Sequence, residues 1–321
     1  MPFDSHGADI TIVPVRTRAE LTRFIKLPIR LNAGDPNWIT PLMMERAEAL
    51  SPKTNPFFEH AEVQLWLAVR GGRDVGRISA QIDALAPQTP GLKTGNFGLI
   101  AAEDDAVIFS LLFRAAEDWL RARGCVRALG PFNLSVNEEV GLLVDGFDTP
   151  PMVMMGHDPA YTGGRVEEQG YAKAKDVYAY LCDPTADLPA VVVALGDRIR
   201  LNNWDEAAFI VLLPNVNEAI ADLKGKLLPF GWAKLLWRLK VSGVKSARVP
   251  LMGVKRKFAD TMRGQLLPFH LMNAGRNASL ALGYTQFEFS WVLEENMPMR
   301  RISEAMGATI YKTYRIYEKT L

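Results

Sequence analysis

Two pairs of adjacent glutamates and one histidine are the residues whose chemistry could carry a reaction in this chain. Glu138 and Glu139 form one pair, Glu294 and Glu295 form the other, and His157 lies in a segment rich in glycine and proline. A carboxylate or a neutral imidazole can take a proton from an attacking amine at neutral pH. We therefore expect the general base to be among Glu138, His157 and Glu295. The alternatives are solvated strand ends for the glutamates and a helix-capping role for the histidine.

A row of amide and hydroxyl side chains precedes the first glutamate pair. Asn133, Ser135 and Asn137 alternate along the sequence, so on a strand they would share one face. Beside a cleft, such a row could bind the polar headgroup of a substrate. It could equally satisfy the backbone of a loop, and the sequence leaves both interpretations open.

Basic residues gather in one stretch of the chain. The net charge is only +1, but eleven basic residues and a single acid, Asp260, lie between Lys224 and Arg263. A local excess of this size favours an anionic partner such as phosphate groups, a lipid surface or nucleic acid. A solvated helix face is the alternative.

Within this stretch, residues 227–240 (LLPFGWAKLLWRLK) predict a helix that lies on a membrane surface. If Gly231–Lys240 is helical, the cations Lys234 and Arg238 lie one turn apart on one face. An apolar face with aromatic residues and a basic flank is typical of a helix bound to anionic lipid. The alternative is a helix packed on its own sheet with its long cations extended to water. The predicted membrane contacts share the apolar face and are Trp232, Leu235, Leu236 and Leu239.

Length and composition predict an ordinary globular chain of about two domains. The 321 residues are 48% hydrophobic and 23% charged, which excludes a disordered, collagen-like or coiled-coil protein. The two cysteines cannot form a disulfide framework, which favours a cytoplasmic protein, peripheral at the inner face of the membrane if it binds lipid. We see neither a signal peptide nor an apolar run long enough to span a membrane. Four scattered histidines lack zinc-site spacing, so no metal is expected.

Apolar periodicity predicts alternating strands and helices, and hence an α/β chain. A hairpin is expected over Val63–Asp83, with its turn at Gly71–Asp74. A loop is expected over Pro131–Pro159. The further strands are expected at Asn96–Ala102, Cys125–Gly130, Ala207–Leu213, Ala247–Val254, Phe287–Leu293 and Thr309–Glu318, and a strand pair is expected after Gly170, through Tyr180. The helices are expected at Ala106–Arg123, Tyr161–Gln169, Phe258–Leu282 and Met297–Met306.

An internal repeat relates the two halves of the chain. When the two halves are aligned at an offset of 137 residues, four positions are identical and the predicted elements follow in the same order. The identical pairs are Glu167 with Glu304, Gly170 with Gly307, Lys175 with Lys312, and Tyr180 with Tyr317. The repeat predicts two copies of a strand–helix–strand–helix–strand module, over residues 1–183 and 184–321. Only about 25 residues separate Asp183 from Ala207, so we expect the second module to be trimmed at its beginning.

This order of elements resembles the C-terminal half of the GNAT (N-acetyltransferase-like) acyltransferase fold. Asn296–Met299 followed by Gly307 is similar to a family motif with a tyrosine seven residues after the asparagine. In the family that tyrosine often protonates the leaving thiolate, but here the position holds Ser303. The resemblance implies that Asn296 contacts the pantetheine arm of coenzyme A. Asn296 is also a natural N-cap for the helix that follows it.

The second module carries three cations where the family carries a glycine-rich loop for the coenzyme A pyrophosphate. Cations bind phosphate well and could replace some of the backbone contacts at the helix N-terminus. The first module has Glu103–Asp105 at the equivalent loop, which would repel a pyrophosphate. We therefore expect acyl-CoA only in the second module. The coenzyme-binding residues implied there are Gly253, Val254, Lys255, Arg256 and Lys257.

Longer motifs resemble a bacterial tandem-module subgroup of this superfamily. They lie at Asn55–Ala61, Gly76–Ile78, Gly130–Glu139, Gly146–Asp148, Ser290–Asn296 and Lys312–Tyr317. One member type of the subgroup makes ceramides by joining a fatty acyl group to a sphingoid amine. The resemblance implies an α/β protein of two GNAT-like modules that share a cleft, each a mixed, mostly antiparallel sheet flanked by helices. It also implies an acyl-CoA-dependent N-acyltransferase whose lipid amine attacks directly at a membrane surface.

Two other function classes stay open on the sequence. The missing tyrosine and glycine would fit a non-catalytic protein that binds a lipid or membrane surface. Other tandem-module relatives take their acyl group from aminoacyl-tRNA, and the basic stretch would then bind RNA. We expect no nucleic-acid partner, since no RNA- or DNA-binding motif is present.

Overall fold

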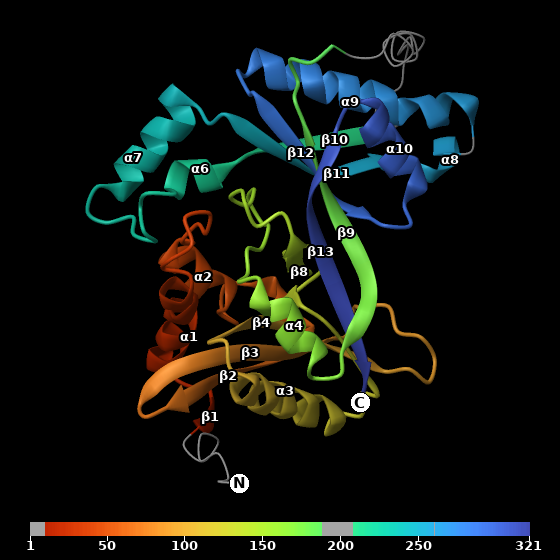
Figure 1. Cartoon of the computed structure of the whole chain (residues 1–321). Helices are drawn as coiled ribbons and strands as arrows, with labels where there is room; N and C mark the ends of the chain where they lie inside the picture. Colours follow the sequence, from red (N-terminus) through yellow and green to blue (C-terminus); the bar gives the residue numbers. More distant parts are fainter. Residues whose placement is uncertain (1–9, 188–207, 260) are drawn as a thin grey trace. The chain divides into compact units, whose positions relative to one another are not determined.

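The computed structural model describes residues 10–187, 208–259 and 261–321, which form two compact units (Figure 1). Unit 1 contains the chain up to Asp176 together with Leu223–Lys226 and Tyr314–Leu321. Unit 2 contains Val177–Asp222 and Leu227–Thr313. Two strands, β9 and β13, have residues in both units, so neither unit is a single stretch of chain. Residues 188–207, where the second module is predicted to begin, lie outside the described ranges, and so does Asp260.

Unit 1 is built on a sheet in the order β1-β2-β3-β4-β5-β13. Neighbouring strands pair antiparallel except β4 and β5, which are parallel. The strands are β1 (Ile10–Pro14), β2 (Ala61–Arg70), β3 (Arg73–Asp83), β4 (Thr94–Ala102), β5 (Arg127–Gly130), β6 (Phe132–Asn133), β7 (Glu139–Val140), β8 (Leu142–Asp145) and part of β13 (Thr309–Thr320). The helices are α1 (Arg18–Leu31), α2 (Met43–Ala49), the short 3-10 helix η2 (Pro56–Glu59), α3 (Ala106–Arg121) and α4 (Tyr161–Glu167). The predicted hairpin is confirmed as β2 and β3.

Helices cover both faces of this sheet. The apolar stripe of α3, with Ile108 and Leu112, packs against one face, and Asp105 caps the helix by accepting from the Val107 amide at 2.8 Å. On the other face, Phe24 and Leu27 of α1 pack against Leu65 and Leu67 of β2 in a second core. Figure 1 shows α1 and α3 on opposite sides of β2 and β3.

Unit 2 is built on a sheet in the order β10-β11-β12-β9. β11 and β12 are parallel, and the other two pairings are antiparallel. The strands are β10 (Ala208–Pro214), β11 (Ser246–Val254), β12 (Gln286–Leu293) and part of β9 (Ala172–Cys182). The strand pair predicted through Tyr180 is wrong, because this segment forms the single strand β9. The helices are α6 (Val216–Ile220), α7 (Gly231–Trp237), the π-helical turn η3 (Arg238–Ser242), α8 (Arg256–Ala259), α9 (Met262–Ala281) and α10 (Met297–Ala305). In the part of the chain that the structure describes, two strands lie beyond β12, whereas four lie beyond β5 in unit 1.

The core of unit 2 lies on the face of the sheet that α9 and α10 cover. Met272 of α9 and Met306, just after α10, are buried there with Phe287 and Phe289 of β12. The long helix predicted from Phe258 is wrong at its start, because Thr261 interrupts it. The Thr261 hydroxyl accepts from the Gly264 amide at 2.9 Å and so begins α9 as a separate helix.

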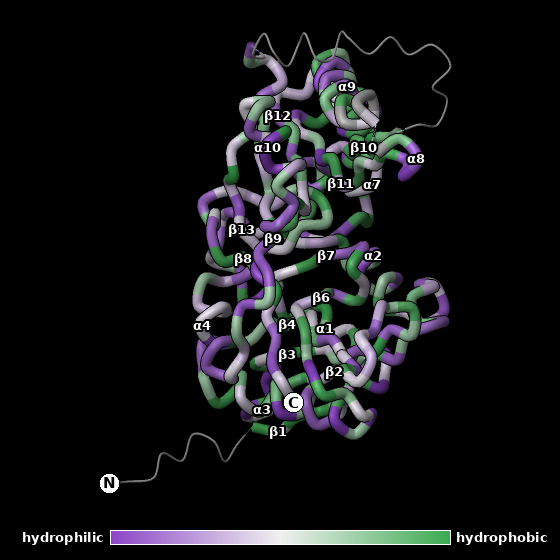
Figure 2. Tube along the Cα trace, turned by 90° about the vertical axis from the view of Figure 1, so that its right-hand side faces the viewer, coloured by the Kyte–Doolittle hydropathy of each residue, from purple (hydrophilic) through white to green (hydrophobic). Residues whose placement is uncertain are grey.

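The internal repeat has a structural counterpart. In unit 2 the Tyr180 hydroxyl donates to Glu304 of α10 at 3.1 Å, and in unit 1 the Tyr317 hydroxyl donates to Glu167 of α4 at 3.2 Å. Positions that match at the predicted offset thus make the same contact. Each tyrosine lies on a strand, β9 or β13, that also has residues in the other unit, and Figure 2 shows hydrophilic stretches along both strands. The predicted domain boundary at residue 183 stays a prediction.

Candidate functional site

The parallel strands β11 and β12 separate partway along their length. Their ladder runs from Ser246 opposite Gln286 to Val249 opposite Phe289, although β11 continues to Val254 and β12 to Leu293. We call the end of this ladder the parting point. Beyond it, the facing backbone groups of the two strands are not paired with each other. Such groups can hydrogen-bond an extended ligand arm that lies between the strands.

The residues predicted to hold the coenzyme phosphates directly follow β11. Gly253 and Val254 end the strand, and the next three side chains, Lys255, Arg256 and Lys257, are all exposed. Lys257 lies over the ring of Phe258, with its ammonium 4.8 Å from the ring centroid. The long helix α9 begins shortly afterwards, so its positive N-terminal end adds to the three cations. This arrangement suits a bound polyanion.

Asn296 follows β12, just as the cationic loop follows β11. Because the two strands are parallel, both segments lie at the same edge of the sheet. The Asn296 side chain caps α10 by accepting from the Met299 amide at 3.3 Å and is exposed. Ser303, at the family's tyrosine position, is fully buried and donates its hydroxyl to the Met299 carbonyl at 3.0 Å. Ser303 is therefore not placed to protonate a thiolate.

In unit 1 the equivalent place is filled by the chain itself. The parallel ladder of β4 and β5 ends at Asn96 opposite Leu129, although β4 continues to Ala102. The next residues of β4 contact β6 instead, since the Leu99 amide donates to the Asn133 side chain at 2.6 Å, and we call β6 the filling segment. A coenzyme arm cannot occupy a space that these residues fill. In unit 1 the backbone of β4 is thus already engaged beyond its ladder, whereas β11 and β12 are not paired with each other beyond the parting point.

We predict that Gly98→Ala destabilises unit 1 by about 1–3 kcal/mol or more, because of overpacking. A Cβ at Gly98 would lie 1.8 Å from the backbone oxygen of Phe132, so the backbone of the filling segment would have to move. Thermal unfolding measures the change. Gly164→Ala in α4 is the matched control, since its Cβ would meet nothing within 4 Å. Equal melting temperatures for the two variants would contradict this packing.

A charged cluster fixes the filling segment in unit 1. The Glu139 carboxylate accepts from Arg46 of α2 at 2.6 Å and from the Asn133 side-chain amide at 2.7 Å. Burial raises the pKa of Glu139, but Arg46 and Asn133 outweigh it and hold that pKa below its usual value. Arg77 lies near the pair, and burial lowers its pKa to about 9. The cluster joins sequence motifs that are far apart along the chain.

Glu138 lies beside this cluster and has a perturbed acidity. Burial raises its pKa to about 7, although the Asn55 side-chain amide contacts it at 3.4 Å. A carboxyl group with such a pKa can exchange protons near neutral pH. Glu295 lies in unit 2, exposed in the turn after β12.

His157 is a buried residue of unit 1 that does not cap a helix. Its Nε2 contacts Asp35 Oδ2 at 2.9 Å, and its ring lies edge-on to Phe147. Helix α4 begins after Ala160, which makes no side-chain cap. The capping interpretation is therefore wrong, and His157 joins two loops of unit 1.

The prediction that Asn133, Ser135 and Asn137 lie on one face of a strand is wrong. β6 ends at Asn133, and Leu134 has φ = 81°, which turns the chain out of the extended conformation. Ser135 then accepts from the Asn137 amide at 3.2 Å within a turn. The Asn133 side chain is engaged by Leu99 and Glu139 rather than directed at a ligand.

The segment predicted to contact a membrane carries an exposed apolar patch. No residue of α7 is buried, so the alternative of a helix packed on its own sheet is not what the structure contains. Lys234 and Arg238 both form ion pairs with Asp222. Leu235 is half-buried, but the other three predicted contacts are exposed. The apolar patch consists of Leu228, Phe230, Trp232, Leu236, Trp237, Leu239 and Val241, whose exposed fractions range from 37% to 79%.

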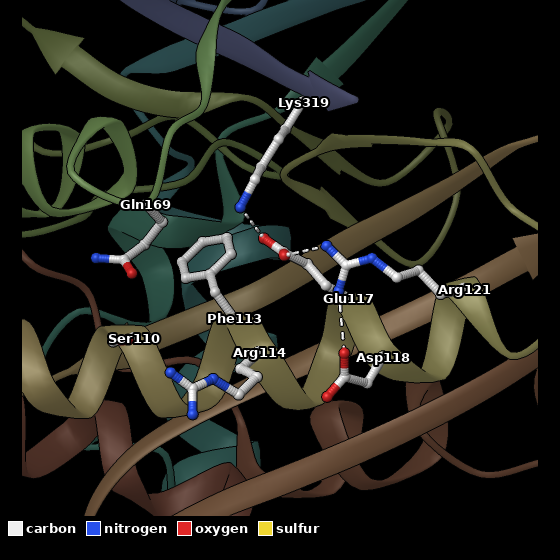
Figure 3. Close-up of a pocket in the computed structure, with 8 residues that line it drawn as sticks. All are labelled: Ser110, Phe113, Arg114, Glu117, Asp118, Arg121, Gln169 and Lys319. Atoms are coloured by element: carbon white, nitrogen blue, oxygen red, sulfur yellow. Dashed lines mark hydrogen bonds and ion pairs between the residues drawn. The ribbon is translucent and has the colours of Figure 1, made fainter. Parts of the chain in front are cut away.

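Unit 1 also contains a polar pocket of about 370 Å³ along α3 (Figure 3). Its charges largely satisfy one another, because Glu117 accepts from Lys319 at 2.7 Å and from Arg121 at 3.0 Å. Asp118 also pairs with Arg121. The pocket contains none of the residues predicted from the sequence.

Sequence reasoning missed a buried charged group in unit 2. Arg248 of β11 and Glu288 of β12 are fully buried and lie opposite each other in the ladder, one step before the parting point. Tyr311 of β13 donates to Glu288. Arg248 and Glu288 both alternate with apolar residues inside strands that were predicted from the sequence. This alternation is the sequence pattern from which the group could have been predicted.

Comparison with known proteins places the chain among acyltransferases. It is 58% identical to the bacterial ceramide synthase of Caulobacter vibrioides, with all of both chains covered, and 40% identical to Protein YghO of Escherichia coli, covering 94% of this chain and 93% of that one. The first alignment runs over 384 positions for 321 residues, so that relative has segments that this chain lacks. No model of a known protein family matches.

The solved structures include a tandem GNAT protein from the clavulanic acid biosynthesis pathway. It is 14% identical and superposes with a TM-score of 0.55 over 97% of this chain and 98% of that one. This likeness shows that the fold is a tandem GNAT fold, as the order of elements predicts. None of the helices in the described ranges has the length and apolarity to cross a membrane.

Proposed function

The chain belongs to the family of the bacterial ceramide synthase, and from this membership we propose that it transfers a fatty acyl group from acyl-CoA to a sphingoid amine. Membership in this family and the tandem GNAT fold make it an N-acyltransferase. The observation that carries the finer proposal is the 58% identity over the full length of a ceramide synthase. A ceramide is the amide of a fatty acid and a sphingoid base.

The proposed reaction is a direct attack of the amine on the thioester. The nitrogen lone pair forms the C–N bond, the C–S bond breaks, and the leaving thiolate takes up a proton. A covalent acyl-cysteine is disfavoured because both cysteines are buried. Burial raises the pKa of Cys182 to about 11 and also raises that of Cys125, so neither thiol forms a thiolate readily.

The coenzyme would be held at the edge of the unit 2 sheet. Lys255, Arg256 and Lys257 would bind its phosphates beside the end of β11 and the start of α9, and Asn296 would contact the pantetheine arm. The exposed side chains of the loop and the parting of β11 and β12 support this proposal. The filled position in unit 1 supports unit 2 as the binding module.

Glu138, His157 and Glu295 remain proposed candidates for the general base, and Asn133, Ser135 and Asn137 remain proposed for the acceptor headgroup. The pKa of Glu138, about 7, favours it among the three. The buried contact of His157 with Asp35 and the engaged side chain of Asn133 favour structural roles for these two.

The apolar patch is proposed to bind the membrane surface from which the lipid amine is taken. Exposed tryptophan, phenylalanine and leucine side chains with neighbouring cations are typical of an interfacial segment. Asp222 compensates Lys234 and Arg238, so the apolar side chains would supply much of the binding energy.

We predict that Trp232→Ser with Leu236→Ser lowers binding to anionic vesicles by at least tenfold. Burying these two side chains in lipid is worth roughly 1.5–3 kcal/mol each, so their loss exceeds the 1.4 kcal/mol of a tenfold change. Co-sedimentation with phosphatidylglycerol vesicles measures the binding. Leu85→Ser, at an exposed leucine of unit 1, is the control and should bind as the wild type does. Unchanged sedimentation of the double variant would contradict a membrane role for the patch.

The proposed function is tested by thiol release. Wild-type protein is mixed with palmitoyl-CoA and sphinganine, and free coenzyme A is followed by its reaction with a thiol reagent. Release that requires both substrates supports the acyltransferase. Binding to vesicles without any release would favour a lipid-binding protein, and release only when aminoacyl-tRNA is added would favour the third class.

A further inference from the structure

The buried charged group of unit 2 lies where a thioester held by the proposed coenzyme site would react. Arg248 and Glu288 form the ladder pair directly before the last pair, Val249 and Phe289. Successive residues of a strand point to opposite faces. Val249 and Phe289 belong to the core under α9 and α10, so Arg248 and Glu288 point to the other face.

This placement follows the expected path of the coenzyme arm. Its phosphates would lie by the start of α9, on the helix-covered side of the sheet. An arm that passes between β11 and β12 at the parting point would emerge on the opposite face, beside Arg248 and Glu288. The carbonyl carbon at its end would then meet the acceptor amine next to this group.

Hydrogen bonds fix the Glu288 carboxylate in a defined orientation. One oxygen accepts from the Ser290 hydroxyl and lies 3.4 Å from Arg248 Nε, while the other oxygen accepts from the Tyr311 hydroxyl. Arg248 Nε also donates to Ser290 at 2.8 Å, and the guanidinium lies over the ring of Trp291, 4.4 Å from its centroid. One oxygen of the Glu288 carboxylate thus contacts Arg248 and Ser290, and the other oxygen contacts Tyr311.

Exposure divides the roles within the group. Arg248 and Glu288 are fully buried, whereas Tyr311 is half-buried. Tyr311 is therefore the residue of the three that a substrate can approach. Glu288 would exchange protons with the substrate only through the Tyr311 phenol. A phenol between a substrate and a buried carboxylate can pass a proton in either direction.

We propose that Tyr311, in place of Glu138, His157 or Glu295, takes the proton of the acceptor amine and returns it to the thiolate, with Glu288 accepting the phenolic proton in between. This assignment rests on the proposed function. It supplies the acid that the chain lacks at Ser303, whose hydroxyl is buried and engaged by Met299. Tyr311 would be a catalytic residue, whereas Glu288, Arg248 and Ser290 would be positioning residues.

The proton transfers balance over one turnover. The neutral amine attacks the thioester carbon, and its proton moves to the Tyr311 oxygen as the phenolic proton moves to Glu288. The C–S bond then breaks, the thiolate takes the proton from Tyr311, and Glu288 returns a proton to the phenol. The products are the amide and the free thiol, and the protein ends in its starting state.

The test compares Tyr311→Phe and Glu288→Gln with the wild type in steady-state transfer from palmitoyl-CoA to sphinganine. Each variant is expected to lower kcat by about 10²-fold, with the KM for palmitoyl-CoA within twofold. The double variant should be no slower than either single variant, because both remove the same proton path. Tyr284→Phe and Glu304→Gln are matched controls in unit 2 and should keep the wild-type kcat.

A pH profile separates this role from a structural one. Burial raises the pKa of Glu288, although Arg248, Ser290, Tyr311 and Lys312 oppose that change. As the pH falls, the wild-type kcat should fall because Glu288 is already protonated and cannot accept. The residual rate of Glu288→Gln should fall less steeply, because only protonation of the acceptor amine then lowers it.

The outcomes are separable from those of the proposed function. An active wild type whose Tyr311→Phe variant keeps kcat within threefold would overturn this assignment alone. A wild type that transfers no acyl group would overturn the proposed function and this assignment with it. Thermal unfolding and calorimetric binding of palmitoyl-CoA check that each variant is folded. If Glu288→Gln does not fold, the kcat of Tyr311→Phe alone tests the assignment.

Discussion

Glu139→Leu is expected to lower the free energy of unfolding by about 2–4 kcal/mol, because it leaves the Arg46 guanidinium without its main partner. The side chains of Glu139 and Arg46 are only 19% and 27% exposed, and the carboxylate is within 2.6 Å of the guanidinium. The variant also removes the acceptor of the Asn133 amide, which helps to fix the segment that fills unit 1. Urea unfolding measures the change.

Two comparisons isolate the buried charge. Arg46→Met combined with Glu139→Leu should recover part of the loss, because it removes the Arg46 charge together with the Glu139 carboxylate, although Glu45 loses its ion pair and Arg77 loses a neighbouring carboxylate. Glu62→Gln breaks an exposed pair with Arg123 and should cost no more than about 1 kcal/mol. A double variant as unstable as Glu139→Leu would contradict this explanation.

The same pair predicts how stability changes with pH. The pKa of Glu139 in the folded protein is lower than the usual 4.5, so its contribution to stability is complete above that value. The contribution is lost as the pH falls through the folded-state pKa. Acid unfolding of Glu139→Leu should therefore be less steep than that of the wild type in this range.

Changing Lys255, Arg256 and Lys257 together to alanine is expected to weaken palmitoyl-CoA binding at least about 30-fold, or ~2 kcal/mol. All three side chains are exposed at the end of β11 and are proposed to contact the coenzyme phosphates. Because they are exposed, their contribution should shrink at high salt. Titration calorimetry at two salt concentrations measures both effects.

The matched control removes three exposed cations from unit 1, with Arg18, Lys26 and Lys53 changed to alanine. It alters the net charge equally but should leave the affinity within twofold. Equal weakening by both triple variants would mean that overall charge attracts the coenzyme without a defined site. Unchanged binding in the loop variant would place the phosphates elsewhere.

Local patterns predicted the elements of this fold well. The apolar stripe of Ala106–Arg123 appears as α3, and Asn296 caps α10 as its position before Met-Pro suggested. The identities at Glu167, Glu304, Tyr180 and Tyr317 mark residues that make matching contacts. These features depend on short-range spacing or on direct identity, which the sequence displays.

Features that depend on distant partners were not predictable in the same way. The chain leaves the extended conformation at Leu134, directly after Asn133, whose side chain contacts Leu99 and Glu139, and neither contact is apparent from spacing. The pairing of Glu139 with Arg46 joins residues far apart in the chain. Arg248, Glu288 and Tyr311 come from three strands, so only the pairing of the sheet brings them together.

The most direct test of the account is to detect the product itself. Wild-type protein is incubated with palmitoyl-CoA labelled with ¹³C at the carbonyl and with sphinganine in anionic vesicles, and the lipids are analysed by mass spectrometry. We predict labelled N-palmitoyl sphinganine in equal amount to the free coenzyme A released, with much less at low palmitoyl-CoA concentration from the Lys255, Arg256 and Lys257 variant. Release of coenzyme A as labelled free palmitate, or no release at all, would contradict the account.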